Sequence, residues 1–270
     1  MFDPRTFFGP AAEFREEWHL PTAHLGRRVF VFRRIDSTNT QALRLVDRTD
    51  LDGVVLLADE QIGGRGQHGR SWFAEPRSGV LLSVLLMPPP SLARPVVMTA
   101  LASVAVCQLV HARTGQVPRI KWPNDVLVDG RKICGILIEQ ARHGDRAAVV
   151  VGLGLNVAQT EAALATAGLP GATSLSACGD LTAERDAVAR HLLHLLDERY
   201  AQLLAGNLAD LESAWVAGLG LLGEQVAIDC HDGAHRGRLI EATFAGLTLL
   251  QPDGDRLRLF PESIRHIERG

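Results

Sequence analysis

The chain has 270 residues, of which 46% are hydrophobic and 22% charged, and its formal net charge is −3. This length allows one large domain and a smaller second one, and the slightly acidic balance argues against non-specific nucleic-acid binding as the main activity. The longest apolar run, residues 80–87, is interrupted by Ser83 and followed by three prolines, far short of a membrane span.

The N-terminal segment carries four acidic residues within its first 17 positions and no apolar signal core. A secretion signal is therefore not expected. The four cysteines have no C-x-x-C spacing and are expected to be reduced, buried thiols. We expect a cytoplasmic protein that does not enter a membrane.

The first half of the chain predicts alternating helices and strands. An amphipathic helix is expected from Pro10 to about Trp18, followed by a strand over 27–35. DSTN (36–39) can cap the next helix, TQALRLVDR, and the buried strand VVLLA (54–58) leads into the loop GGRGQHGRS (63–71). The segment SWFAEPRSG precedes a strand over 80–87, and the apolar segment 93–115 predicts a buried helix that ends at Gly115.

The second half predicts hairpins and then helices. Strands are expected at 119–122, 125–128, 132–140 and 147–157, with turns at Asp129-Gly130 and His143-Gly144-Asp145. Helices are expected at about 160–167, 183–204 and 208–217. From about 222, five short strand-like runs predict a small SH3-like barrel, and the glycine-rich GLGLLG (218–223) marks the boundary.

The glycine-rich loop is close to a phosphate-binding P-loop, since Gly64 is followed after four residues by Gly69-Arg70-Ser71. A P-loop must pass directly into a helix, whereas a strand is expected after this loop, so that interpretation is rejected. An exposed flexible loop is one alternative. We favour a mobile loop that becomes ordered on an anionic ligand, because its glycines and arginines have no apolar side chain to pack.

A second glycine motif, GLGLNV (152–157), has two open interpretations. It lacks the third glycine of a dinucleotide fingerprint and follows hairpins, which argues against that fold. Alternatively, Gly152 and Gly154 allow a close backbone approach near a strand end, where Asn156 offers both a donor and an acceptor.

Only two of the 28 basic residues are lysines, Lys121 and Lys132. Lysine presents a compact ammonium and arginine a planar fork, so two lysines in an arginine-rich chain suggest sites that need the ammonium. Lys121 opens KWPND (121–125), in which Pro123 ends a strand. We expect both lysines on consecutive, paired strands, converging on one anion; two solvated strand lysines are the alternative.

No metal site built from protein ligands is predicted. His191, His194 and Glu198 could share one helix face, but they flank an apolar stripe and are better explained as a solvated helix flank. We recognise no H-E-x-x-H, no G-x-S-x-G and no clustered Cys/His set.

Taken together, four segments resemble the biotin protein ligase family. They are DSTN (36–39), EQIGGRGQHGRSW (60–72), KWPNDVLVDGRKICGILIE (121–139) and GLGLNV (152–157), in the order and spacing of that family. The resemblance covers about residues 29–217 and the small C-terminal domain. It implies an α+β fold similar to class II aminoacyl-tRNA synthetases, with a mixed, largely antiparallel sheet backed by helices. The implied organisation is an N-terminal extension (1–28) with a short helix, a catalytic domain (29–220) and an SH3-like domain (221–270).

The resemblance also implies a reaction. Biotin would be activated by ATP, with Mg²⁺, as biotinoyl-5′-AMP, and then transferred to a lysine of a biotin carboxyl carrier protein. Biotin would contact Ser37, Thr38, Asn39, Gln61, Gly64, Arg65, Gly66, Gln67, Lys132 and Gly135. ATP or the adenylate would contact Arg65, Arg70, Trp72, Lys121, Asn124 and Asn156. Catalysis would rest on Lys132, Lys121 and Arg65, with Asp125 as a candidate base for the acceptor lysine.

The sequence departs from the family pattern at two places. About 28 residues precede the first expected strand, too few for the DNA-binding domain of many members, so we expect a ligase without repressor function or DNA binding. Gln67 stands where many members carry an arginine, which predicts weaker retention of the adenylate. A lipoate or octanoate ligase and a non-catalytic biotin-binding regulator are the alternatives, and a homodimer is left open.

Overall fold

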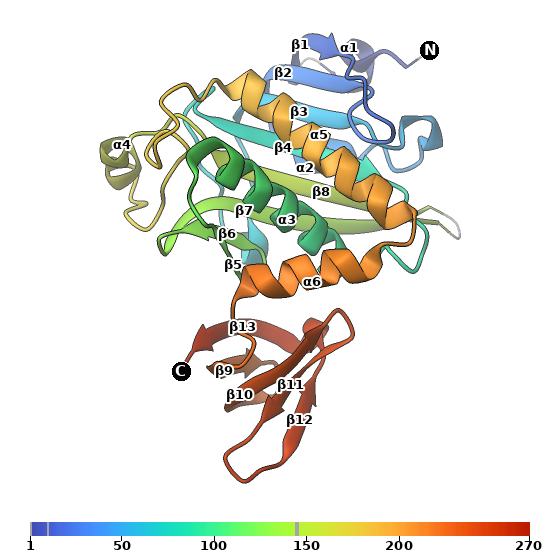
Figure 1. Ribbon diagram of the computed structural model, residues 1–270. Coiled ribbons are helices and arrows are strands. Elements are labelled where there is room, and N and C mark those ends of the chain that lie inside the picture. The colour runs from blue at the N-terminus through green and yellow to red at the C-terminus, as the bar shows by residue number, and fades with distance from the viewer. Residues whose placement is uncertain (1, 10, 144–145) are drawn as a thin grey trace.

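The computed structural model describes residues 2–9, 11–143 and 146–270. Its larger sheet has eight strands in the order β1-β2-β3-β4-β8-β7-β6-β5 (Figure 1). Only the β2–β3 pair is parallel, so the prediction of a mixed, largely antiparallel sheet is confirmed. The strands are β1 (Glu13–Trp18), β2 (Val29–Ile35), β3 (Val55–Gln61), β4 (Gly79–Leu86), β5 (Arg119–Lys121), β6 (Asp125–Val128), β7 (Arg131–His143) and β8 (Arg146–Asn156).

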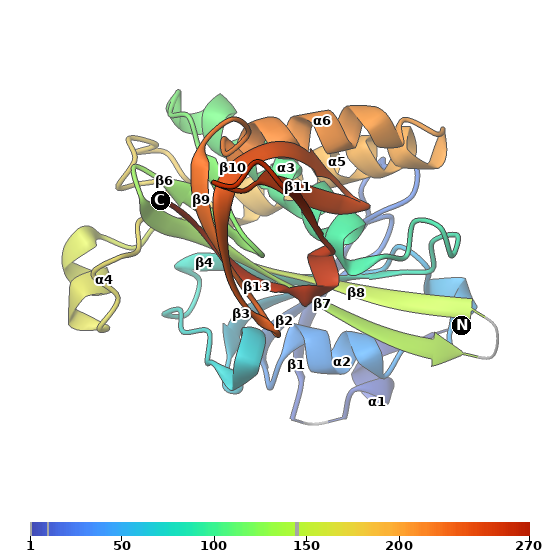
Figure 2. The ribbon, with the colours of Figure 1, turned by 90° about the horizontal axis from the view of Figure 1, so that it is seen from below.

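Three long helices, α3 (Pro95–Thr114), α5 (Arg185–Leu204) and α6 (Leu208–Leu219), cover one face of this sheet, and α2 (Thr38–Leu43) lies on the other (Figures 1 and 2). By length and composition alone α3 could cross a membrane, but it packs between the sheet, α5 and α6 with most of its residues buried, as a core helix does. The helices are α1 (Pro4–Phe7), α2 (Thr38–Leu43), α3 (Pro95–Thr114), α4 (Glu161–Thr166), α5 (Arg185–Leu204) and α6 (Leu208–Leu219). Single 3₁₀ turns occur at Thr49–Leu51, Gln67–Gly69 and Pro261–Ser263.

Strand alternation assigns side chains to the two faces of the sheet. In β8, Val151 and Leu153 join the core beneath the long helices, whereas Gly152 and Gly154 face the other way. Because Gly154 pairs with Gly135 of β7, the two central strands present a patch without side chains on the face away from the long helices.

The C-terminal residues form a second sheet of five antiparallel strands in the order β12-β11-β10-β9-β13. These strands are β9 (Gln225–Cys230), β10 (Gly233–Thr243), β11 (Gly246–Leu250), β12 (Arg256–Leu259) and β13 (Ile264–Arg269). The Trp122 indole N–H donates to the carbonyl oxygen of Ile264 at 3.2 Å, and the Trp215 ring lies 5.2 Å from that of Phe244. The predicted number of short strands is confirmed. This sheet packs against α6 and, through Trp122, against the corner between β5 and β6 (Figure 1).

The helix expected from Pro10 to Trp18 is wrong. Its segment EFREEW contains good helix formers, yet it forms the edge strand β1, paired antiparallel with β2. The pairing places the Phe14 ring 5.9 Å from the Phe32 ring and buries Trp18, so tertiary packing outweighs local helix propensity. Pro10 and the turn residues Gly144 and Asp145 lie outside the described residues.

Candidate functional site

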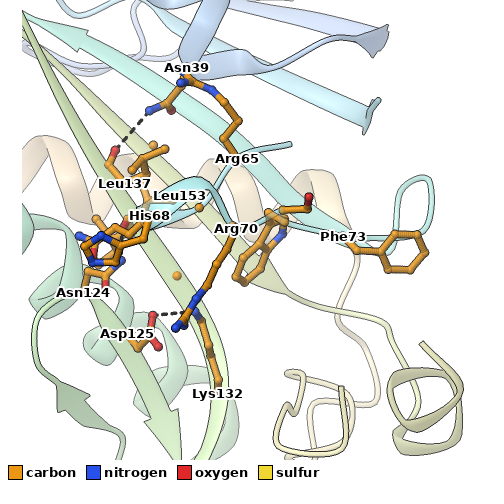
Figure 3. Close-up of a pocket in the computed structure, with 18 of the residues that line it drawn as sticks. Asn39, Arg65, His68, Arg70, Phe73, Asn124, Asp125, Lys132, Leu137 and Leu153 are labelled. Carbon is orange, nitrogen blue, oxygen red and sulfur yellow. Dashed lines mark hydrogen bonds and ion pairs between the residues drawn. The ribbon is translucent and has the colours of Figure 1, made fainter. Parts of the chain in front are cut away.

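A cavity of about 590 Å³ opens on the sheet face away from the three long helices (Figure 3). It is lined by the start of α2, the glycine-rich loop, the β5–β6 corner, and the glycine positions of β7 and β8. Every site residue predicted from the sequence lines this cavity except Gly64. Those that do are Ser37, Thr38, Asn39, Gln61, Arg65, Gly66, Gln67, Arg70, Trp72, Lys121, Asn124, Asp125, Lys132, Gly135 and Asn156.

The floor of the cavity depends on glycines. A Cβ atom at Gly154 would lie 2.4 Å from the indole of Trp72, and one at Gly135 would lie 2.7 Å from it. A Cβ atom at Gly152 would lie 2.0 Å from the Oδ1 atom of Asn39. Real Cβ atoms do not approach so closely, so any larger residue would displace Trp72 or Asn39. The predicted close approach at Gly152 and Gly154 is confirmed, with these two side chains as its occupants.

The start of α2 is held by a polar network. Ser37 is the N-cap, and the Thr38 backbone N–H and hydroxyl donate to Oε1 of Gln61 at 2.7 and 3.0 Å. The Ser83 hydroxyl lies 2.7 Å from Thr38 Oγ1 and 2.5 Å from Asn39 Oδ1. Ser83 was not predicted as a site residue. Its signal was a single polar residue within an otherwise apolar buried strand.

Glu139 of β7 links the helix to the loop, and it was also missed. Its carboxylate accepts a hydrogen bond from Asn39 Nδ2 at 2.8 Å and two from Arg65 Nη2 at 2.8 and 3.0 Å. The Asn39 amide donates as well to the carbonyl oxygen of Leu137, which Figure 3 marks. Because β7 side chains alternate, Glu139 shares the face of Gly135, and that spacing could have identified it.

Lys132 lines the cavity and contacts two other lining residues. Its Nζ atom lies 2.6 Å from Asp125 Oδ1 and 5.2 Å from the centroid of the Trp72 ring. Lys121 is exposed and lines the same cavity. The expectation that the two lysines lie on paired strands is wrong, because β6 lies between β5 and β7, and Lys121 pairs with Asp125. Both nevertheless border one cavity.

The corner between β5 and β6 is hydrogen-bonded to β7. The Asn124 side-chain amide donates to the Ile136 carbonyl oxygen at 2.6 Å, and the Ile136 N–H donates to the Asn124 carbonyl oxygen at 2.9 Å. The predicted end of the strand before Pro123 is confirmed, since β5 ends at Lys121, and the Trp122–Pro123 peptide bond is cis.

The glycine-rich loop folds as a short hairpin. Arg65 bridges Ser71, the Gly66 N–H donates to the Arg70 carbonyl oxygen at 2.7 Å, and the chain reverses at Gln67–Gly69. Figure 3 shows Arg70 extending from the loop toward Asp125 and Lys132. Strand β4 follows the loop, so the rejection of a P-loop is confirmed. That the loop becomes ordered on an anion stays a prediction.

Both polar atoms of the Asn156 side chain form hydrogen bonds within the protein. Its Nδ2 atom donates to the Thr173 carbonyl oxygen at 2.9 Å, and its Oδ1 atom accepts from Gln159 Nε2 at 3.2 Å. Strand β8 lies antiparallel between β4 and β7, which excludes the dinucleotide-binding interpretation of GLGLNV. A contact of Asn156 with adenine stays a prediction.

Two further lining residues come from the C-terminal sheet. Arg265 and His266 of β13 border the cavity, and neither was predicted as a site residue. Contacts between segments 140 residues apart cannot be read from local pattern. The second sheet therefore contributes side chains to the rim of the cavity.

Within the described parts of the chain, one group of three side chains brings potential metal ligands within 4.8 Å of one another, and it is not on α5. It consists of Cys230, Asp232 and His235 in the β9–β10 hairpin. The expectation that the chain has no clustered Cys/His set is therefore wrong; the segment CHDGAH (230–235) was the overlooked signal. On α5, burial lowers the pKa of His191, as expected for a helix flank partly covered by neighbouring side chains.

The sequence and the fold match a known class of enzymes. The model of the biotin/lipoate A/B protein ligase family matches residues 31–156. The biotin–[acetyl-CoA-carboxylase] ligase of Mycobacterium tuberculosis is 36% identical over 216 residues, which cover 77% of this chain and 76% of that protein. The bifunctional ligase/repressor BirA of Bacillus spizizenii is 30% identical over 244 residues, covering 90% of this chain and 75% of that protein.

Within that class the chain belongs to the biotin protein ligase family. The structure of the biotin protein ligase from Aquifex aeolicus in complex with biotin and ATP superimposes with a TM-score of 0.69. It is 23% identical and covers 90% of this chain and 99% of that one, which supports the α+β fold alone. The resemblance noted in the sequence is confirmed.

Proposed function

We propose that the protein is an ATP-dependent biotin protein ligase. The observation that carries the proposal is one cavity bordered by the two rare lysines and by the loop arginines Arg65 and Arg70, in a chain of this family. Family membership supplies biotin and ATP as substrates, and the cations supply what two reacting anions require.

The first step joins the biotin carboxylate to the α-phosphorus of ATP, and the bond to pyrophosphate breaks. Both reactants are anionic where they meet. Lys132, held between Asp125 and Trp72, and Lys121 would stabilise the crowded oxygens. Arg65 and Arg70 would cover the adenylate from the loop and shield its mixed anhydride from water.

Mg²⁺ is proposed to enter with the ATP phosphates. The carboxylates of Asp125 and Glu139 are already paired with Lys132 and Arg65, so these residues do not form a protein-ligated magnesium site.

In the second step the amine of an acceptor lysine attacks the anhydride carbonyl carbon, AMP leaves, and the amine loses a proton. Asp125 remains the proposed base, although its partnership with Lys132 favours an additional role in orienting that ammonium. The acceptor is proposed to be a biotin carboxyl carrier domain, in keeping with the names of the relatives.

We also propose a class II synthetase-like catalytic domain (29–220) after an extension (1–28), and an SH3-like barrel formed by residues 221–270. A cytoplasmic location is proposed as well. The net charge of −3 gives no support to DNA binding. A homodimer is compatible with the family resemblance.

The test combines the protein with ATP, Mg²⁺, biotin and a carrier domain, and measures pyrophosphate release and biotinylated lysine separately. Lys132→Met should lose both signals. The matched control is Arg131→Met, since Arg131 is the adjacent cation and pairs with Glu161 away from the cavity. Absence of transfer by the wild type, or a Lys132→Met variant that behaves like it, would refute the proposal.

A lipoate or octanoate ligase is the second candidate, because the matching family model includes lipoate enzymes. The same assay with each acid in place of biotin distinguishes the two. A biotin-binding regulator without catalysis would bind biotin and release no pyrophosphate.

A further inference from the structure

The tip of the β9–β10 hairpin brings three metal-ligating side chains together. Cys230 ends β9, Asp232 lies in the turn, and His235 follows in β10. Because Cys230 pairs with Gly233, His235 projects from the same face of the hairpin as Cys230. The thiol sulfur, a carboxylate oxygen and an imidazole nitrogen all lie within 4.8 Å of one another.

A second observation concerns the imidazole. The Nε2 atom of His235 is shielded from solvent, and it has no hydrogen-bond partner among the described residues. Its neighbour Asp232 Oδ1 is 3.6 Å away, too far for a hydrogen bond. An unsatisfied buried nitrogen costs about 1–3 kcal/mol, and coordination of a cation would remove that cost.

The surrounding charges are compatible with a cation. Arg265 contacts the Cys230 carbonyl oxygen at 2.8 Å, but its guanidinium is paired with Asp229, also at 2.8 Å. Burial raises the pKa of the Cys230 thiol, while its contact with Ser263 acts in the opposite direction. A bound metal would release the thiol proton to solvent as the metal–sulfur bond forms.

We propose that Cys230, Asp232 and His235 bind one divalent transition-metal ion, with water completing the coordination. The donor set identifies the class of ion: thiolate and imidazole suit Zn²⁺ or Co²⁺, whereas Mg²⁺ and Ca²⁺ prefer oxygen ligands. Three protein ligands with one open position fit a tetrahedral ion. None of the three side chains lines the cavity described above, although Arg265 of its rim donates to the Cys230 carbonyl oxygen, so the three side chains are distinct from the proposed ligase residues.

The test is a Co²⁺ titration of the metal-stripped full-length protein near neutral pH. We expect one Co²⁺ per chain, a thiolate-to-cobalt charge-transfer band in the near ultraviolet, and loss of the band when Zn²⁺ is added. Cys230→Ser should abolish the band. His235→Gln keeps the thiol, so the band should remain at saturation while the affinity falls by at least about tenfold.

Two matched controls test the assignment. Cys178→Ser removes a free thiol outside the hairpin, and His231→Gln removes the exposed histidine of the same turn; both should bind Co²⁺ like the wild type. Circular dichroism checks folding, and His235→Gln keeps the test valid if the buried Cys230 tolerates no change. Absence of a cobalt band in the wild type, full affinity in His235→Gln, or an equal loss in either control would overturn the proposal. The readout does not depend on ligase activity.

Discussion

Replacing Glu139 with glutamine tests whether one carboxylate positions both the loop and α2. Glu139 accepts from Asn39 Nδ2 at 2.8 Å and from Arg65 Nη2 at 2.8 Å, so it connects two elements that border the cavity. It uses only one terminal nitrogen of Arg65, which leaves guanidinium donors for a ligand. Glutamine keeps the shape and one acceptor oxygen but removes the charge.

The expected loss of free energy follows from how exposed the two interactions of Glu139 are. The side chains of Arg65 and Glu139 are 44% and 22% exposed, so their ion pair contributes about 0.2–1 kcal/mol. The bond from Asn39 is partly buried, and neutralising its acceptor weakens it by about 1 kcal/mol. The two losses add up to about 1–2 kcal/mol for Glu139→Gln. This corresponds to roughly 5–30-fold in an equilibrium or rate constant.

The assay is the rate of biotinoyl-AMP release from the purified protein, measured with the KM for biotin. We expect Glu139→Gln to release the adenylate about 5–30-fold faster. Glu60→Gln is the matched control, because Glu60 pairs with Arg34 at 3.8 Å and does not line the cavity. Release within twofold of wild type, or equal acceleration in the control, would show that Glu139 does not position the loop.

Four other substitutions can be tested separately: three alter the cavity, and one tests the pH dependence of stability. Lys132→Arg keeps the charge but replaces the compact ammonium that contacts Asp125 and Trp72, so we expect ligation to fall about 100-fold, whereas Lys121→Arg at an exposed position should lose far less. Gly154→Ala should displace the indole that lies 2.4 Å from the new Cβ atom, seen as a change in tryptophan fluorescence and a higher KM for biotin. Gln67→Arg adds a loop cation and should slow adenylate release; unchanged retention would contradict that reasoning. Burial depresses the folded-state pKa of His191 below the usual histidine value of 6.5, so the unfolded state binds the proton more readily and stability falls as the pH drops through 6.5. The His191→Gln variant should lose this part of the pH dependence in thermal unfolding between about pH 7 and 5.

Strand alternation explains why so much of the site could be predicted. The spacing of Gly152 and Gly154 in an apolar run placed both glycines on one face and indicated a close approach. What approaches them could not be read from the sequence, because Asn39 and Trp72 come from segments more than 80 residues away. That contact depends on the order of strands across the sheet and on the fold of the loop, neither of which local pattern determines.

The failures have the opposite origin: in each, a local pattern was misleading or was weighed too little. Residues 13–18 contain four charged residues and good helix formers, yet pairing with β2 and burial of Trp18 make them a strand. Glu139 lies inside the strand expected over 132–140, and its period-two spacing from Gly135 places it on the site face, but it was not predicted as a site residue. Cys230 and His235 lie on one face because of the hairpin register between β9 and β10, which the sequence pattern does not determine.

The different places of lysine and arginine in this cavity follow from what each side chain must tolerate. Lys132 belongs to β7, where its Nζ atom lies 2.6 Å from Asp125 Oδ1 and 5.2 Å from the centroid of the Trp72 ring. An ammonium places one compact charge at this point, whereas a guanidinium would spread its charge over a planar group. Arg65 projects from a glycine-rich hairpin at the rim, where its planar group can contact Glu139 and still offer donors to a phosphate. The arginine-rich chain therefore keeps lysine at a position where one compact charge contacts both a carboxylate and an aromatic ring.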